Sequence, residues 1–187
     1  MNTTPVLYCD PAASPGLHDM FMEYVRERIL ARHDILLRPG EICKNIYFVE
    51  SGLLRCFYHH GGKEVTSWFA QKGDFCWSPE SFLHQKPGIE QIEALEENTV
   101  ISFFSFDALR CIYTLFPEFR ALEESVTQRH LLAVQRKMQA MWMQQSPARL
   151  AWFQQEFPGL QKRIHGKHLA SWLGITEVMM SRILHRT

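Results

Sequence analysis

The residues best suited to contact a large partner lie near the C-terminal end of this sequence. Between positions 167 and 185, ammonium, hydroxyl, guanidinium and imidazole groups recur at helical spacing, and such groups contact phosphates and base edges. The set consists of Lys167, Thr176, Glu177, Val178, Ser181, Arg182 and His185. These residue types in this order predict a surface that binds double-stranded DNA.

Two short helices within residues 166–186 are predicted to position this surface. The first has an apolar stripe at helical spacing, formed by Leu169, Ala170 and Leu173. Gly174 then permits a left-handed turn, and Thr176 can cap a second helix. The apolar face of that helix consists of Met179, Met180 and Ile183. This is the helix-turn-helix pattern, in which the second helix enters the major groove. The alternative is an ordinary pair of packed helices.

The distribution of charge favours the DNA-binding interpretation. The whole chain has 20 basic and 20 acidic residues. From Pro147 onward there are six basic residues against Glu156 and Glu177, a net +4, which leaves −4 for residues 1–146. A basic end on an acidic body suits a polyanionic partner.

The other candidate ligands and nucleophiles form no catalytic or metal-binding pattern. Adjacent His59 and His60 point to opposite faces of a strand, which disfavours the ligand set of a cupin-like enzyme, a remote alternative. Five scattered cysteines lack metal-site spacing and are expected to be reduced and mostly buried: Cys9, Cys43, Cys56, Cys76 and Cys111. We therefore expect no enzyme activity, no metal and no cofactor. With no membrane-length apolar run and no signal pattern, a cytoplasmic protein without a membrane partner is predicted.

The first two thirds of the chain predict a β-domain with flanking helices. Residues 17–30 show helical spacing, whereas residues 34–106 show short β-branched and aromatic runs with turns roughly every ten residues, typical of an antiparallel sandwich. Gly61-Gly62 marks the clearest hairpin. Residues 76–92 read as an irregular insertion with a helical turn near 81–84, and residues 107–116 as a short helix. Such an insertion is often a binding element.

Residues 117–144 predict one long helix without Gly or Pro. Its apolar positions recur at intervals of three and four, the pattern of a helix that packs on another helix, and are Leu131, Val134, Met138 and Met141. The sequence predicts a homodimer through this helix, and the alternative is packing on its own β-domain alone. Ser146 is expected to cap the next helix, over residues 149–157, with Pro147 at its first position.

The ordered set of fragments resembles the cyclic-AMP receptor protein/FNR (Crp/Fnr) family of bacterial transcription regulators, in its short, wingless, Bacteroidetes-type form. The fragments are RPGE, VESGLLR, GGKEVTSWFAQKGDF, SFLHQKP, IEALEE, FPEFR and HLASWLGITEVMMSRI. The resemblance implies an α+β chain: a jelly-roll, cyclic-nucleotide-binding-like domain over residues 1–116, a dimerisation helix over 117–146, and a helix-turn-helix domain over 147–187. It also implies a homodimer that binds DNA, with a possible small-molecule effector and RNA polymerase as a possible partner.

The resemblance assigns roles to single residues and has two departures. Ser181 and Arg182 match the Ser-Arg of the family's recognition helix, and Thr176 matches its capping phosphate contact. Relatives commonly have Thr-Pro-Glu where this chain has Thr176-Glu177-Val178. One residue rotates a helical side chain by about 100°, so Glu177 does not inherit the role of the usual base reader. A ligand-independent dimeric interaction protein with a degenerate DNA-binding head is therefore the main alternative.

The second departure concerns the nucleotide pocket. No Arg lies between Arg55 and Arg110, and Lys86 is the single cation of the insertion, whereas a buried phosphate needs a fixed donor. Cyclic AMP is therefore not expected to bind. If an effector binds, the resemblance places its site between the sandwich and the insertion, near aromatic and neutral polar residues: Phe75, Trp77, Ser81, Phe82 and Gln91. It would take an uncharged or weakly polar ligand, or none if the aromatic rings fill it.

Overall fold

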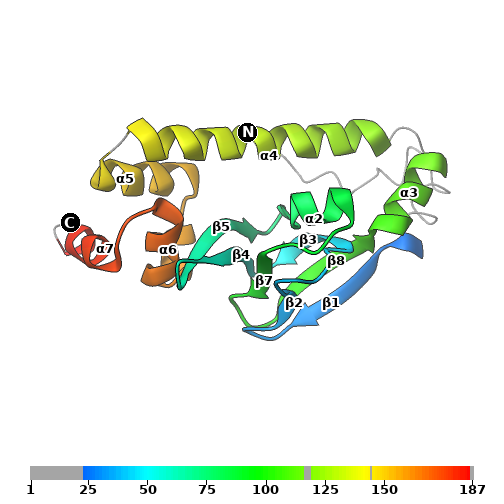
Figure 1. Cartoon of the computed structure of the whole chain (residues 1–187), viewed down its shortest axis with the longest axis horizontal. Coiled ribbons are helices and arrows are strands. Elements are labelled where there is room, and N and C mark those ends of the chain that lie inside the picture. Colours follow the sequence, from blue (N-terminus) through cyan, green and yellow to red (C-terminus); the bar gives the residue numbers. More distant parts are fainter. Residues whose placement is uncertain (1–22, 116–118, 144, 186–187) are drawn as a thin grey trace.

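The computed structural model describes residues 23–115, 119–143 and 145–185. Two four-stranded antiparallel sheets form a sandwich beneath a long helix (Figure 1). The first sheet contains, in spatial order, β1 (Arg26–Leu30), β8 (Thr99–Ser105), β3 (Asn45–Ser51) and β6 (Phe75–Cys76). The second contains β2 (Ile35–Leu37), β7 (Glu90–Ala94), β4 (Leu53–His60) and β5 (Lys63–Gln71). The prediction of an α+β chain built on an antiparallel sandwich is confirmed.

The core of the sandwich is formed by side chains that alternate along the strands and point between the sheets. Val49 of β3, Leu54 of β4, Ile92 of β7 and Ile101 of β8 are all inaccessible to solvent and belong to one apolar cluster. Burial of such side chains on one face of each strand is what the period-two pattern predicts.

The predicted β4–β5 hairpin is present. The turn residues Gly61 and Gly62 have φ angles of 58° and 74°, in the left-handed region that a tight two-residue hairpin turn requires. The strands pair from Leu53 with Gln71 to His60 with Lys63, and a register shift lies between Cys56 and Phe57.

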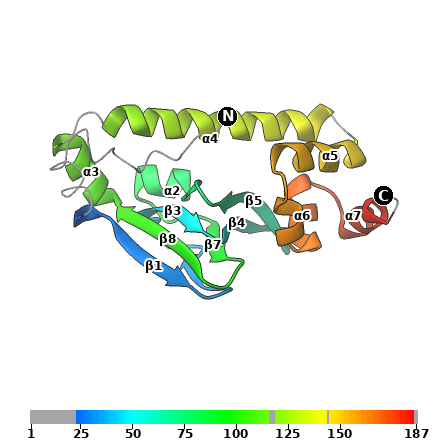
Figure 2. The ribbon, with the colours of Figure 1, turned by 180° about the vertical axis from the view of Figure 1, so that it is seen from behind.

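The helix predicted over residues 17–30 is wrong for its final part. Residues 17–22 lie outside the described residues, and Arg26–Leu30 form β1, which pairs with β8 along its whole length (Figure 2). In this strand Ile29 is 68% exposed, whereas Leu30 is fully buried. The open edge of β8 offers backbone hydrogen bonds that outweigh a weak local preference for helix.

The predicted irregular insertion is more ordered than the sequence indicated. Its helical turn is α2 (Pro79–His84), which begins slightly earlier than expected, and its final residues belong to β7. Strand β7 was missed because Pro87 and Gly88 precede it and the run EQIEA is short and partly charged. Its inward residues Ile92 and Ala94 are nevertheless fully buried, between the neighbours β2 and β4.

Three helices follow the sandwich. Helix α3 (Phe106–Leu115) matches the predicted short helix, and α4 (Phe119–Met143) matches the predicted long one. Figures 1 and 2 show that α4 runs along one side of the molecule, from α3 to α5 (Ser146–Glu156). The prediction that Ser146 caps α5 is wrong. Gln145 occupies the N-cap position without a side-chain cap bond, Ser146 is the first helical residue, and Pro147 still lies in the first turn, where it removes no intrahelical bond.

The chain ends in η1 (Leu160–Arg163), α6 (Gly166–Leu173) and α7 (Glu177–Leu184). These helices and α5 share a second apolar core with one end of the β-domain. Phe153, Leu169 and Leu173 are buried in it together with Leu53 and Phe69 from the strands. The C-terminal helices are therefore packed onto the β-domain.

Candidate functional site

The turn between α6 and α7 is built as the sequence predicted. Gly174 adopts φ 63° after α6, and the amide of Ile175 donates to the Ala170 carbonyl. Thr176 Oγ1 accepts a hydrogen bond from the Met179 amide at 3.1 Å, which caps α7. The backbone groups at the end of α6 and at the start of α7 thus form hydrogen bonds within the turn. These bonds fix the direction of α7 relative to α6.

All seven residues predicted to contact DNA are exposed: Lys167, Thr176, Glu177, Val178, Ser181, Arg182 and His185. Six of them lie on α7 or at its two caps, while Lys167 lies in the first turn of α6. Met180 is buried and Ile183 packs on the second core, but Met179, predicted for the same apolar face, is 39% exposed. Within the described part of the chain, neither Lys167 nor Arg182 forms an ion pair.

Helix α6 is fastened to strand β5 by hydrogen bonds of Ser171. Ser171 Oγ donates to the Glu64 carbonyl at 2.7 Å and accepts from the Thr66 amide at 2.9 Å. Farther along, Arg163 makes two hydrogen bonds to the Glu96 carboxylate, at 2.8 and 2.7 Å. The C-terminal helices are therefore held by backbone and ionic contacts as well as by apolar packing.

A buried charge cluster lies next to this contact. Arg55, 1% exposed, donates to Glu64 at 2.8 Å, to Glu93 at 3.1 Å and to the Thr66 hydroxyl at 3.0 Å. His168 of α6 approaches Glu64 at 3.9 Å. Burial, and then nearby cationic side chains, lower the pKa of His168 to about 4, so this imidazole is neutral near pH 7.

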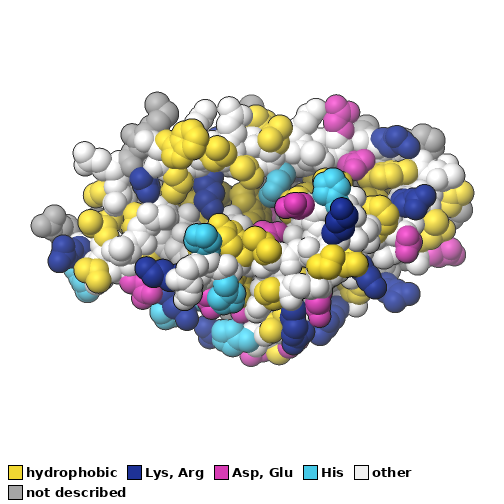
Figure 3. Space-filling model, viewed as in Figure 1, with side chains coloured by type: hydrophobic (Ala, Val, Ile, Leu, Met, Phe, Trp, Pro, Cys, Tyr) yellow, Lys and Arg dark blue, Asp and Glu magenta, His cyan; other side chains and the backbone are white. Residues whose placement is uncertain are grey.

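One edge of α4 carries exposed apolar side chains. Leu131 is 65% and Met138 46% exposed, whereas Val134 and Met141 are partly covered by the chain's own β-domain and C-terminal helices. Trp142, which is not one of the four apolar positions predicted to form the interface, is 81% exposed at the end of the same edge. Figure 3 shows hydrophobic side chains gathered over the C-terminal half of α4. The predicted row of apolar residues on α4 is thus partly covered by the chain's own domains and partly exposed.

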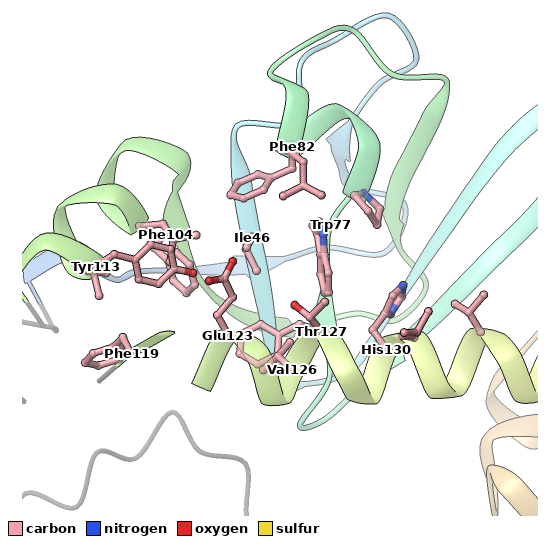
Figure 4. A pocket seen from close by; sticks show the side chains of 17 residues that line it. Ile46, Trp77, Phe82, Phe104, Tyr113, Phe119, Glu123, Val126, Thr127 and His130 are labelled. Atoms are coloured by element: carbon pink, nitrogen blue, oxygen red, sulfur yellow. The ribbon is translucent and has the colours of Figure 1, made fainter. Parts of the chain in front are cut away.

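The cavities between α4 and the β-domain include two of nearly equal volume. The first, called the α3 chamber, has a volume of about 370 Å³ and lies among α2, α3, β3 and the N-terminal half of α4 (Figure 4). Its walls are almost entirely apolar, and in Figure 4 Tyr113 and Glu123 point toward one another at one end. Burial and hydrogen bonding to Glu123 raise the pKa of Tyr113, so it remains a neutral phenol.

The second cavity, called the β5 chamber, has a volume of about 390 Å³ and lies between β4, β5 and the C-terminal half of α4. The rings of Trp77 and His130 line both chambers and are 5.0 Å apart between centroids. The β5 chamber contains polar groups that the α3 chamber lacks, including the Glu90 carboxylate, the Ser67 hydroxyl and the Lys137 ammonium group. Cavities of this size hold small molecules.

Of the five residues predicted for an effector site, three line a chamber and two do not. Phe75 and Trp77 line both chambers, and Phe82 lines the α3 chamber. Ser81 lines neither, because its hydroxyl accepts from the Cys43 amide and donates to the Lys86 carbonyl and so fastens α2. Gln91 also lies outside both chambers.

Sequence reasoning missed Lys137, because it considered cations of the insertion alone. A signal was available: Lys137 lies three residues after Val134 and four before Met141, which places it on the inward side of the same helix. Its ammonium group lies 3.0 Å from the Ser67 carbonyl oxygen and 3.5 Å from that of Thr66.

The described residues contain no group of three or more His, Cys, Asp or Glu placed to hold a metal ion. Cys43, Cys56 and Cys76 are buried, and burial raises the pKa of each thiol, which makes them unreactive. Within the same part of the chain, no helix is both long and apolar enough to cross a bilayer.

Comparisons with known proteins agree with this architecture. Residues 27–113 match the cyclic nucleotide-binding domain family. A sequence comparison with curated proteins finds no match. Many solved structures share the fold. A mutant of CooA from Carboxydothermus hydrogenoformans has a TM-score of 0.71 and 20% identity, over 100% of this chain and 84% of that one. FixK2 from Bradyrhizobium japonicum has a TM-score of 0.74 and 16% identity, over 87% of this chain and 83% of that one.

The third structure is CLP from Xanthomonas campestris, described as a c-di-GMP-responsive global regulator. It has a TM-score of 0.73 and 16% identity, over 92% of this chain and 91% of that one. A further solved structure of the same fold is described as a transcriptional regulator of the Crp/Fnr family, from Eubacterium rectale, with a TM-score of 0.73 and 18% identity, over 96% and 86%. Residues 27–113 therefore resemble the cyclic nucleotide-binding domain family, and the chain has the fold of these solved structures, one of which is described as a transcriptional regulator of the Crp/Fnr family.

Proposed function

We propose that this protein is a Crp/Fnr-type transcription regulator that binds double-stranded DNA as a homodimer and does not respond to cyclic AMP. The observation that carries the proposal is the geometry of α6 and α7. A capped helix projects a continuous exposed surface of Thr176, Ser181, Arg182 and His185, while its opposite side is fixed to a second core. A rigid helix with polar groups directed outward fits the major groove.

The dimer is supported by the free apolar edge of α4. An exposed row of Leu131, Met138 and Trp142 on a 25-residue helix suits pairing with the same edge of a second copy. Two copies would also present two α7 helices to successive major grooves, as a two-fold operator requires. The partners are then a second copy, duplex DNA and, at a promoter, RNA polymerase, in the cytoplasm.

The absence of a cyclic AMP response is supported by the groups that line the β5 chamber. Lys137 is the single Lys or Arg among its described lining residues, and it is already held by two backbone carbonyls. Glu90 adds a negative charge to the same cavity. A cyclic phosphate is best held by a fixed bidentate donor such as Arg, which this chamber does not provide. Calorimetry with cyclic AMP at micromolar concentration is expected to give no heat of binding.

DNA binding is tested with variants of two exposed cations. Arg182→Ala should weaken binding to a selected duplex by about 1–3 kcal/mol and relax sequence preference, because Arg commonly reads guanine edges. Lys167→Ala should weaken selected and random duplexes alike and reduce the salt slope by about one, because it contacts phosphate. Lys86→Ala, a charge change on the β-domain, is the control and should have no effect. Fluorescence anisotropy over a salt series measures all three.

A degenerate DNA-binding head is the second candidate, favoured by the exposure of Val178, at 62%, on the surface expected to read bases. A wild-type dimer that binds neither selected nor random duplex at low salt would establish this alternative and refute the first.

A further inference from the structure

Lys137 places a charged group in the wall of the β5 chamber without a counter-ion. Its described polar contacts are the neutral carbonyls of Ser67 and Thr66, and its Nζ atom lies 4.4 Å from the centroid of the Trp172 ring. No carboxylate in the described part of the chain lies within ion-pair distance of it. A cation that is largely removed from water without an anion is unfavourable, and burial lowers the pKa of Lys137 to about 8.

The other titratable groups that line the chamber leave this charge uncompensated. They are Cys56 and Tyr58 from β4, Glu90 from β7 and His130 from α4. Burial raises the pKa of Cys56 and lowers that of His130, so both are neutral near pH 7. Glu90 accepts a hydrogen bond from the Ser67 hydroxyl at 3.0 Å, and no ion pair joins it to Lys137.

The same lysine connects the chamber to the C-terminal helices. Its carbonyl acceptors belong to the stretch of β5 whose Thr66 amide donates to Ser171 of α6. Its other contact, Trp172, is the next residue of α6 and lies in the second core. A displacement of the Lys137 ammonium group would therefore alter contacts on both sides of the junction between β5 and α6.

We propose that the β5 chamber binds a small monocarboxylate whose anionic group pairs with Lys137, and that this pairing weakens the attachment of α6 to β5. The proposal rests on the proposed function and extends it by assigning a ligand to this chamber. With two of its three donors directed at carbonyls, the ammonium group has one donor left, which suits a single carboxylate oxygen of a compact monoanion. The apolar body of the ligand packs against Trp77, Val134 and Met138, and Glu90 disfavours a second negative charge.

Binding is measured with three probes, namely benzoate, 3-phenylpropionate and hexanoate, by calorimetry and by the fluorescence of the tryptophans at the chamber. The corresponding amides match them in shape and carry no charge. We expect at least one acid to bind the wild-type protein, and its amide to bind at least about tenfold more weakly, a difference of about 1.4 kcal/mol. Affinity should decrease as the pH rises through about 8, because the ammonium group loses its proton.

Variants of Lys137 identify the group that binds. Lys137→Met should abolish the preference for the acid over the amide, Lys137→Arg should retain it, and Lys86→Met is the control that should leave it unchanged. If Lys137→Met does not fold, two measurements on the wild-type protein still test whether Lys137 pairs with the acid. They are the pH dependence of acid binding and the ratio of the affinities for acid and amide. Failure of all three acids to bind at about 10 mM, or equal affinities of acid and amide, would overturn the proposal.

The coupling to α6 has its own measurement. The bound acid should speed hydrogen exchange at the Thr66 amide, which Ser171 protects, and should not do so in Lys137→Met. Acid binding with unchanged exchange would overturn the coupling. DNA binding without binding of any acid would overturn this inference and leave the proposed function intact. Acid binding by a protein that does not bind DNA would overturn the proposed function and leave the binding of acid to this chamber intact.

Discussion

Replacement of Trp142 by Glu tests the proposed dimer most directly. Trp142 is 81% exposed on the free edge of α4. A Trp side chain of about 200 Å² then offers roughly 160 Å², worth about 4 kcal/mol at 25 cal/mol per Å² if fully covered. Coverage of half this area gives about 2 kcal/mol per copy, and the two-fold symmetry of a dimer doubles it to about 4 kcal/mol. Trp142→Glu should therefore weaken dimerisation by roughly a thousandfold.

Sedimentation equilibrium over a concentration series measures this dissociation constant. Leu132→Glu is the matched control, because Leu132 is a 50% exposed apolar residue of the same helix that lies away from the edge formed by Leu131, Met138 and Trp142. The control should leave the dissociation constant within a few fold of the wild type. A monomeric wild-type protein at micromolar concentration, or equal effects of both substitutions, would refute the assignment of this edge as the interface.

Three further predictions concern the attachment and stability of the C-terminal helices. Thr176→Ala removes the cap on the Met179 amide and should lower the free energy of unfolding by about 1 kcal/mol, measured by urea denaturation; no loss would contradict the capping role. Ser171→Ala leaves the Thr66 amide without its acceptor, which should cost about 1–3 kcal/mol, and hydrogen exchange at that amide should accelerate. His168 has a folded pKa of about 4 against an ordinary value of 6.5, so the unfolded chain binds its proton first. Stability should fall as the pH decreases from 6.5 toward 4, and His168→Gln should reduce that decline.

Much of the local structure could be predicted because it depends on neighbouring residues. The Gly61-Gly62 turn and the Thr176 cap follow from backbone conformations and side-chain bonds that span two to four positions. The same holds for the left-handed Gly174 that ends α6. The long α4 follows from an uninterrupted helical pattern. At these positions local preference and tertiary packing agree.

Other features depend on partners that are distant in the sequence. Residues 26–30 became strand β1 because the edge of β8, some 70 residues later, offered hydrogen bonds, and β7 became a strand because β2 and β4 flank it. Which apolar residues of α4 are covered and which are exposed depends on the side of this helix that the β-domain occupies. Periodicity identifies an apolar face, but only the packed fold determines what covers it.

The sequence by itself therefore determined the fold class, the turn between α6 and α7 with its Thr176 cap, and most of the residues exposed on α7. The tertiary structure decided the composition of the β5 chamber. Lys137 reaches it from α4, Ser67 from β5 and Glu90 from β7, whereas Ser81 and Gln91 do not line it. A cavity is lined by side chains from several elements, and their convergence depends on the orientation of each helix and strand in the packed fold. No local pattern encodes that orientation, because it is set by the packing of the two cores as a whole.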